Sequence, residues 1–149
     1  MNMQENLVQS LHNAMRANDD VTKRTIRMVL SAIKMAEIEK GQPLDDVGII
    51  GILQKEIKIR TEASQDAEKA RREDLVLEAK AEQKVIETFL PKQLSENEIE
   101  VLVKEAIIET NASNPADMGR VMKAVMPKLQ GRAAGDRISL IVRKLLSPG

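Results

Sequence analysis

Residues 117–146 read DMGRVMKAVMPKLQGRAAGDRISLIVRKLL and contain two apolar ladders at helical spacing. Apolar residues at i, i+3, i+4 and i+7 share one face of a helix, so each ladder predicts an amphipathic helix. The ladders are Met118, Val121, Met122, Val125, Met126 and Leu129, then Ile138, Ile141, Val142 and Leu145. The residues left for the opposite faces and the joining loop include Arg120, Lys123, Lys128, Arg132, Arg137, Arg143 and Lys144. The stretch therefore predicts a helical hairpin that is apolar inside and basic outside.

The composition of the whole chain agrees with an all-α protein. Hydrophobic residues make up 42% of the 149 residues, which is enough for a core, and Phe89 is the only aromatic residue. Such a core consists of aliphatic and Met side chains, which helix-on-helix packing tolerates better than a β-sandwich does. No stretch of strict alternation predicts a strand. The length fits one domain or two small ones.

Breaks in the helical pattern predict two all-helical domains. Helices are expected at residues 3–17, at 21–40, after a cap at Asp45 or Asp46, and at 73–89, which together form a four-helix bundle-like domain with a long helical hairpin. Ser95 and Glu98 have capping-box spacing and open a fifth helix, with Leu94 as its hydrophobic staple. Asn114 caps a sixth helix, and a seventh follows Gly135. The domains are residues 1–93 and a small three-helix domain, residues 94–149.

The inner faces of the first four helices follow from the same periodicity. After Ile59 the third helix offers only alanines to a core, so residues 55–72 are interpreted as a solvated helical extension or a protruding turn, with a partner surface as the alternative. The expected core residues are Leu7, Leu11, Ala14, Met15, Ile26, Val29, Leu30, Ile33, Ile49, Ile50, Leu53, Ile57, Leu75, Ala79, Ile86, Phe89 and Leu90.

Several classes of chemistry lack the residues they need. The chain has no Cys, which excludes disulfides and thiolate chemistry. A lone His12 cannot supply the two Glu-x-x-His pairs of a di-iron site, so Glu37, Glu39, Glu56 and Glu62 predict no metal centre, and no catalytic residue or cofactor is predicted. No signal peptide and no apolar run of about 18 residues is visible, so a soluble cytoplasmic protein without a membrane partner is expected.

Charge is distributed unevenly along a chain whose net charge is zero. Residues 112–149 contain seven Lys and Arg against Asp117 and Asp136, whereas residues 1–111 contain 16 basic and 21 acidic residues. This asymmetry favours a polyanionic partner at the positive end, with a solvated face as the alternative. Because that end lacks aromatic residues, nucleic acid would be recognised through phosphates, riboses and shape rather than base stacking.

Two further motifs have two interpretations each. QGRAAGD places two glycines beside a helix N-terminus, which suits a phosphate but also an ordinary turn between helices. The row Met118, Met122 and Met126 suits core packing, or a groove for a partner helix.

The motifs FLPKQLSENEIE and MGRVMKAVMPKLQGRAAGDRISLIVRKLL, with LQKEIKIRTEA and AEKARREDLV before them, resemble the GatB/YqeY family over nearly the whole chain. The similarity is to its stand-alone YqeY-like members. AAGDR departs mildly from the usual residues of the family at this loop. The family shares an all-helical module with the tail of the B subunit of the aspartyl/glutamyl-tRNA amidotransferase, a carbon–nitrogen ligase with glutamine as amido-N-donor.

The resemblance implies a tRNA-binding accessory protein linked to tRNA-dependent amidation. Its partners would be tRNA and components of the amidotransferase or of an aminoacyl-tRNA synthetase. The expected contact residues are Arg120, Lys123, Lys128, Gly131, Arg132, Gly135, Arg137, Arg143 and Lys144. The alternatives are a protein–protein adaptor without nucleic-acid binding and, ranked last because no activated nucleophile is visible, an amido-transfer enzyme.

Overall fold

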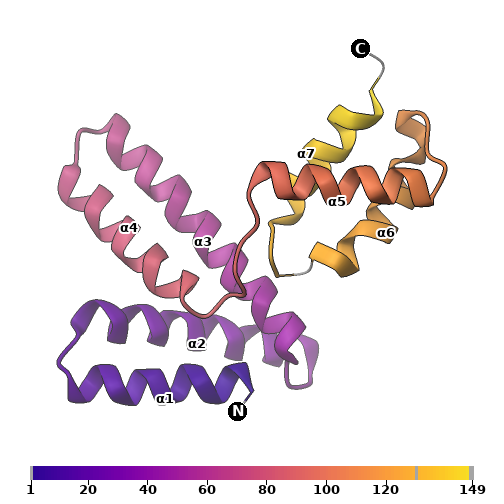
Figure 1. Ribbon diagram of the computed structural model, residues 1–149. Helices are drawn as coiled ribbons and strands as arrows, with labels where there is room; N and C mark the ends of the chain where they lie inside the picture. The colour runs from indigo at the N-terminus through magenta and orange to yellow at the C-terminus, as the bar shows by residue number, and fades with distance from the viewer. Residues whose placement is uncertain (1, 130, 148–149) are drawn as a thin grey trace. The chain divides into compact units, whose positions relative to one another are not determined.

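The computed structural model describes residues 2–129 and 131–147, and these are helical without a strand (Figure 1). The all-α prediction is confirmed. The chain divides into two compact units, Met1–Leu90 and Pro91–Gly149, each with a core of its own. Within the described residues no helix is both long enough and apolar enough to span a bilayer.

The first unit consists of two helical hairpins (Figure 1). The helix α1 packs on α2, α3 packs on α4, and α2 also contacts both helices of the second hairpin. The bounds are Met3–Arg16 for α1, Asp20–Lys40 for α2, Asp46–Lys69 for α3 and Glu73–Glu87 for α4.

Side-chain caps fix where these helices begin. Asn2, Asp19 and Asp45 each accept a hydrogen bond from the backbone N–H three residues later, at 2.8, 3.1 and 2.9 Å. Asp45 rather than Asp46 is therefore the cap of α3. Gly41 ends α2 with a φ of 75°, a conformation that costs glycine nothing.

The core of the first unit is aliphatic, as its sequence predicts. Two of the expected core residues lie elsewhere: Met15 and Leu75 are 46% and 41% exposed. The fully buried cluster is Leu7, Ile26, Val29, Ile33, Ile49, Leu53 and Ile86, and Phe89 and Leu90 pack against it.

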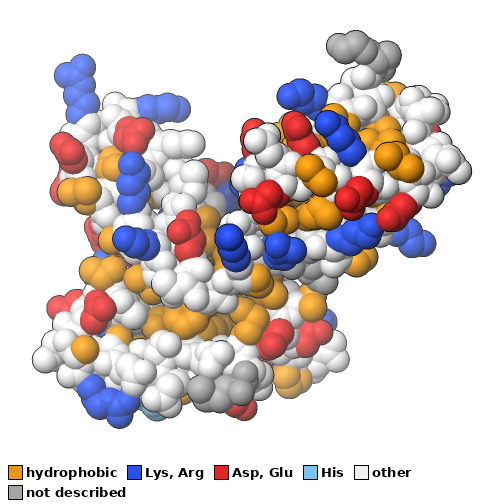
Figure 2. All heavy atoms as spheres, in the orientation of Figure 1, with side chains coloured by type: hydrophobic (Ala, Val, Ile, Leu, Met, Phe, Trp, Pro, Cys, Tyr) orange, Lys and Arg blue, Asp and Glu red, His pale blue; other side chains and the backbone are white. Residues whose placement is uncertain are grey.

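The stretch 55–72 is not a wholly solvated extension, and that interpretation is wrong for one of its faces. The helix α3 continues to Lys69, and Arg60, Ser64 and Ala67 are buried on it. Only short side chains and one guanidinium group stand on this face, so α4 can pack close against α3. Figure 2 shows Lys, Arg, Asp and Glu side chains on the visible face of this hairpin, among apolar and uncharged ones.

The second unit contains α5 (Glu96–Glu109), the 3-10 turn η1 (Pro115–Asp117), α6 (Met118–Leu129) and α7 (Gly135–Leu146). The Ser95 hydroxyl accepts from the Glu98 N–H at 3.2 Å, and Leu94 is buried beside it, so the predicted cap and staple are both present. Asn114 caps η1, which leads directly into α6.

All three α-helices of the second unit contribute to one core. Its buried residues are Leu94, Ile99, Val103, Ala106, Val121, Val125, Leu129, Ala133, Ile138, Ile141, Val142 and Leu146. Met118 and Met122 pack against this core, whereas Met126 is 37% exposed. The Met row therefore mainly fills the core of this unit.

Candidate nucleic-acid interface

The ladders on α6 and α7 determine where the basic side chains point. At about 100° per residue, Arg120 and Lys123 lie on the side of α6 opposite the buried Val121 and Val125. The same geometry places Arg137 and Lys144, seven residues apart, on the outer side of α7. The seven predicted basic residues are all solvent exposed.

Two of the seven cations are paired with carboxylates. The Arg120 Nη2 lies 2.8 Å from Asp117 Oδ1, and the Lys128 Nζ lies 2.9 Å from Glu109 Oε1 on α5. The Ser113 backbone N–H, and then the Arg120 guanidinium, hold the pKa of the Asp117 carboxyl below its usual range by donating hydrogen bonds to it. These two cations are thus partly neutralised within the unit.

The other five cations form no ion pair among the residues that the structure describes. Each is exposed, and they are divided between the outer side of α6, the loop after it and the outer side of α7. They are Lys123, Arg132, Arg137, Arg143 and Lys144.

The loop between α6 and α7 is held by its backbone carbonyls. The Leu94 N–H donates to the Arg132 carbonyl at 2.8 Å, and Gln93 Nε2 donates to the Gly131 carbonyl at 2.7 Å. Gly131 is buried and has a φ of 76°, a conformation that favours glycine. The backbone alone therefore explains the glycine at this position, and no ligand contact is needed. No local pattern indicated this role of Gln93, because its partner is 38 residues away.

Gly135 differs from Gly131. It is the first residue of α7, it is exposed, and a Cβ added to it would meet nothing within 4 Å. Its preceding cap residue, Ala134, provides no side-chain hydrogen bond, but the Asp136 carboxylate in the first turn accepts from the Arg137 N–H at 2.9 Å. Arg132 and Arg137 lie near this helix end, and the Asp136 carboxylate already offsets part of the positive charge there.

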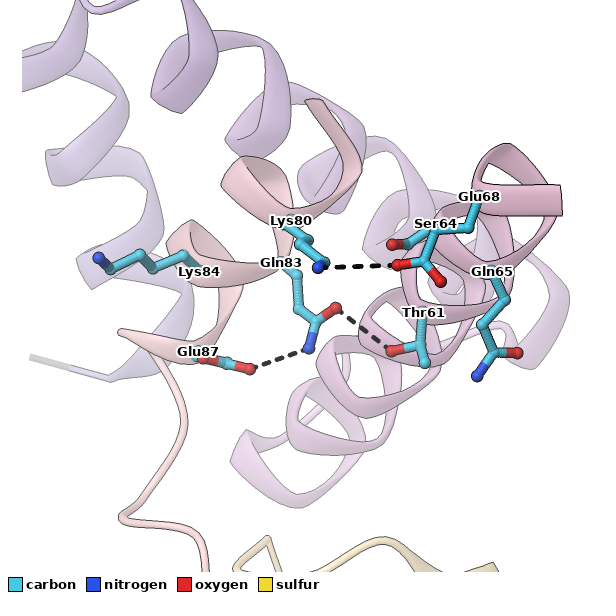
Figure 3. A pocket seen from close by; sticks show the side chains of 8 residues that line it. All are labelled: Thr61, Ser64, Gln65, Glu68, Lys80, Gln83, Lys84 and Glu87. Carbon is cyan, nitrogen blue, oxygen red and sulfur yellow. Dashed lines mark hydrogen bonds and ion pairs between the residues drawn. The ribbon is translucent and has the colours of Figure 1, made fainter. Parts of the chain in front are cut away.

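A polar hollow lies in the first unit. It has a volume of about 540 Å³ between α3 and α4, and its polar side chains bind one another (Figure 3). Thr61 Oγ1 lies 3.2 Å from Gln83 Oε1, and Lys80 Nζ lies 3.8 Å from Glu68 Oε1. No lining side chain is His or Cys. In the described part of the chain, no group of three or more His, Cys, Asp and Glu is arranged to hold a metal.

Comparison with known proteins places the chain in a family. The family model described as "Yqey-like protein" matches residues 4–146. Among curated relatives, "Altered inheritance of mitochondria protein 41, mitochondrial" from Lachancea thermotolerans is 36% identical over 74% of this chain and 61% of its own length. The protein of the same name from Pyrenophora tritici-repentis is 31% identical over 83% of this chain and 68% of its own.

These relatives correct the expected localisation. They are named as mitochondrial proteins, which contradicts the cytoplasmic location expected from the sequence. The chain spans about three fifths of the length of the Lachancea relative (61%), so activities of such whole proteins do not transfer to it directly. The match over residues 4–146 nevertheless covers both units, and the chain belongs to the YqeY-like family.

Proposed function

We propose that this protein is a tRNA-binding accessory protein linked to tRNA-dependent amidation, and that its second unit binds the RNA. The observation that carries the proposal is a set of five exposed cations on α6, α7 and their loop that form no ion pair with any described residue. A phosphate backbone would bind these cations and release counterions.

The mode of binding follows from the side chains available. The second unit has no aromatic residue on which a base could stack, so cations and backbone N–H groups would bind phosphates and riboses. Arg120 and Lys128 would contribute less, because each already has a carboxylate partner. Such binding discriminates by shape more than by base sequence.

The link to amidation rests on the resemblance to the tail of the amidotransferase B subunit. The described residues offer no activated nucleophile, so the chemistry would belong to partner proteins, either amidotransferase or aminoacyl-tRNA synthetase components. By analogy with the named relatives, we propose that this function is exercised in mitochondria.

A fluorescence-anisotropy titration with unmodified tRNA transcript tests this proposal. If all five cations contact phosphates, affinity should fall by roughly two to three orders of magnitude between about 50 and 200 mM salt. The double variant Arg137→Glu/Lys144→Glu should abolish most binding, whereas Lys34→Glu/Lys55→Glu, with the same charge change on exposed lysines of α2 and α3, should bind like the original protein. Absence of binding at low salt, or equal losses in both variants, would refute the proposal.

The alternative function is a protein–protein adaptor that binds no nucleic acid. The observation that favours it is an apolar groove in the first unit, described below. In that case a partner should survive nuclease treatment in a pull-down, and charge reversal at Arg132 should leave its recovery unchanged.

A further inference from the structure

An open groove of about 670 Å³ runs between α3 and α4 in the first unit, on a different side of the hairpin from the polar hollow of Figure 3. Three large apolar side chains reach it from three helices: Met28 from α2, Ile59 from α3 and Leu75 from α4, which are 47%, 46% and 41% exposed. Its full lining is Met28, Glu56, Ile59, Arg60, Ala63, Asp66, Ala67, Ala70, Leu75, Glu78, Ala79 and Glu82.

Alanines keep the groove open. Ala63 and Ala67 on α3 and Ala70 at its C-cap follow at spacings of four and three residues, and Ala79 on α4 lines the same groove. Because an alanine side chain ends at Cβ, the two helices approach without filling the space above their contact. The lining on α3 extends from Glu56 to Ala70, a length of roughly 21 Å at 1.5 Å per residue.

A buried ionic cluster forms the floor. Arg60 is 4% exposed, and its Nε and Nη1 lie 3.1 Å from Glu82 Oε1 and Glu56 Oε1. Its Nη2 lies 3.6 Å from the Met28 sulfur. These contacts tie α2, α3 and α4 together, so the groove is formed before any ligand arrives.

The rim of the groove is acidic. Including the floor, the groove is lined by four carboxylates, those of Glu56, Asp66, Glu78 and Glu82, and by one cation, Arg60. Arg24 lies 3.4 Å from Glu78 and 3.5 Å from Glu82, so two positive charges stand against four negative ones. Asp66 is exposed and forms no ion pair with any described residue. The excess negative charge repels nucleic acid and anionic lipid, and it attracts cationic groups.

We propose that this groove binds one basic amphipathic helix of a partner protein. The helix would be about 14 residues long, to match the groove. Its apolar ridge, at i, i+3, i+4 and i+7, would lie on the alanines between Met28, Ile59 and Leu75. Its Lys and Arg residues would reach Asp66 and Glu78. This interaction is separate from the RNA binding proposed for the second unit.

The test uses the full chain and a fluorescein-labelled synthetic helix of about 14 residues containing only Leu, Ala and Lys. Its leucines are placed at i, i+3, i+4 and i+7, and a scrambled peptide of identical composition serves as the control. We expect saturable binding of the amphipathic peptide and none of the scrambled one. Equal binding of the two peptides, or binding of neither, would overturn the proposal.

Two matched pairs of variants locate the binding. Ala63→Leu fills the groove and should weaken peptide binding by at least about tenfold, whereas Gln65→Leu adds the same side chain beside the polar hollow and should have no effect. Asp66→Lys should likewise weaken binding, and Glu68→Lys should not. Thermal unfolding of all four variants shows whether each is folded. Equal effects within both pairs of folded variants would exclude the groove.

Two other occupants give distinct results. If sedimentation equilibrium shows self-association that Ala63→Leu abolishes, the groove binds a second copy and the proposal is wrong. If Ala63→Leu weakens tRNA binding while Gln65→Leu does not, the groove belongs to the RNA surface, which also overturns it. Unchanged tRNA affinity in both variants, with selective loss of peptide binding, supports the proposal independently of whether the RNA hypothesis holds.

Discussion

Arg60 is the buried charge on which the α3–α4 hairpin depends. Removing a guanidinium from water is costly, and two carboxylates with their hydrogen bonds offset that cost here. Glu82 is only 8% exposed, so it depends equally on Arg60. If Arg60 is removed, Glu82 keeps only a longer contact of 3.5 Å, to the exposed Arg24.

Replacement of Arg60 by alanine should therefore destabilise the first unit strongly. We expect a loss of up to about 3–5 kcal/mol in its free energy of unfolding, because the buried Glu82 keeps only the longer contact to Arg24. Urea titration followed by circular dichroism measures the loss. The control Arg72→Ala removes an exposed ion pair with Asp74 and should leave the midpoint nearly unchanged. Equal midpoints for the two variants would contradict this role of Arg60.

Asp117, the residue before α6, makes a pH-dependent contribution to the stability of the folded second unit. Its folded-state pKa lies below the ordinary value of 3.8, so the contribution is fully present above that value and is lost as the pH falls through the folded-state pKa. Carboxyl-carbon NMR should show the Asp117 titration shifted downward. Arg120→Ala should reverse only part of this downward pKa shift, because the hydrogen bond from the Ser113 N–H is its larger cause. A return to the ordinary value in that variant would refute this ranking of causes.

At the scale of elements, two glycines differ in the reason for being glycine. Gly131 in the α6–α7 loop is required by its backbone conformation, whereas Gly135 at the start of α7 is not. Gly131→Ala places a Cβ at a φ of 76° and should destabilise the second unit by about 1–2 kcal/mol. Gly135→Ala meets no atom within 4 Å and should stabilise it by up to about 1 kcal/mol. Thermal unfolding measures both effects.

The RNA titration then tests Gly135 as a contact. If phosphate must approach its backbone closely, Gly135→Ala should weaken tRNA binding although the protein is no less stable. Unchanged affinity would remove Gly135 from the proposed interface and leave the cations in it.

Local patterns made the helices predictable. Aliphatic residues at i, i+3 and i+4 identified the buried faces, and Ser95 and Asn114 marked helix starts where the structure has them. These signals operate within about one helical turn, so the sequence contains both partners side by side.

The errors concern contacts between distant residues. Arg60 looked solvated because its partner Glu82 is 22 residues away, on another helix. Leu75 shares a face of α4 with the buried Ala79, Glu82 and Ile86, but it lies in the first turn of the helix and borders the open groove, where it is 41% exposed. The exposure of the seven predicted cations followed from the ladders, whereas the pairing of Lys128 with Glu109 depends on how α5 packs. Whether these cations bind RNA stays a prediction.

At the scale of the whole molecule, each unit has its own core. A fragment comprising residues 91–149 should therefore be helical and unfold cooperatively, although a core of this size is marginal. Far-ultraviolet circular dichroism during heating measures this. A fragment without helical signal would show that the second core depends on the first unit.

The hydrogen bonds from Gln93 and Leu94 to Gly131 and Arg132 have a mechanical consequence. They connect residues 93 and 94, where the chain enters the second unit, to the loop that carries Arg132 and precedes α7. A pull on the chain just before Gln93 would strain these two bonds before it reached the aliphatic interior. Tension on this linking segment, for instance when the first unit binds another molecule, would therefore act first on the α6–α7 loop that carries Arg132.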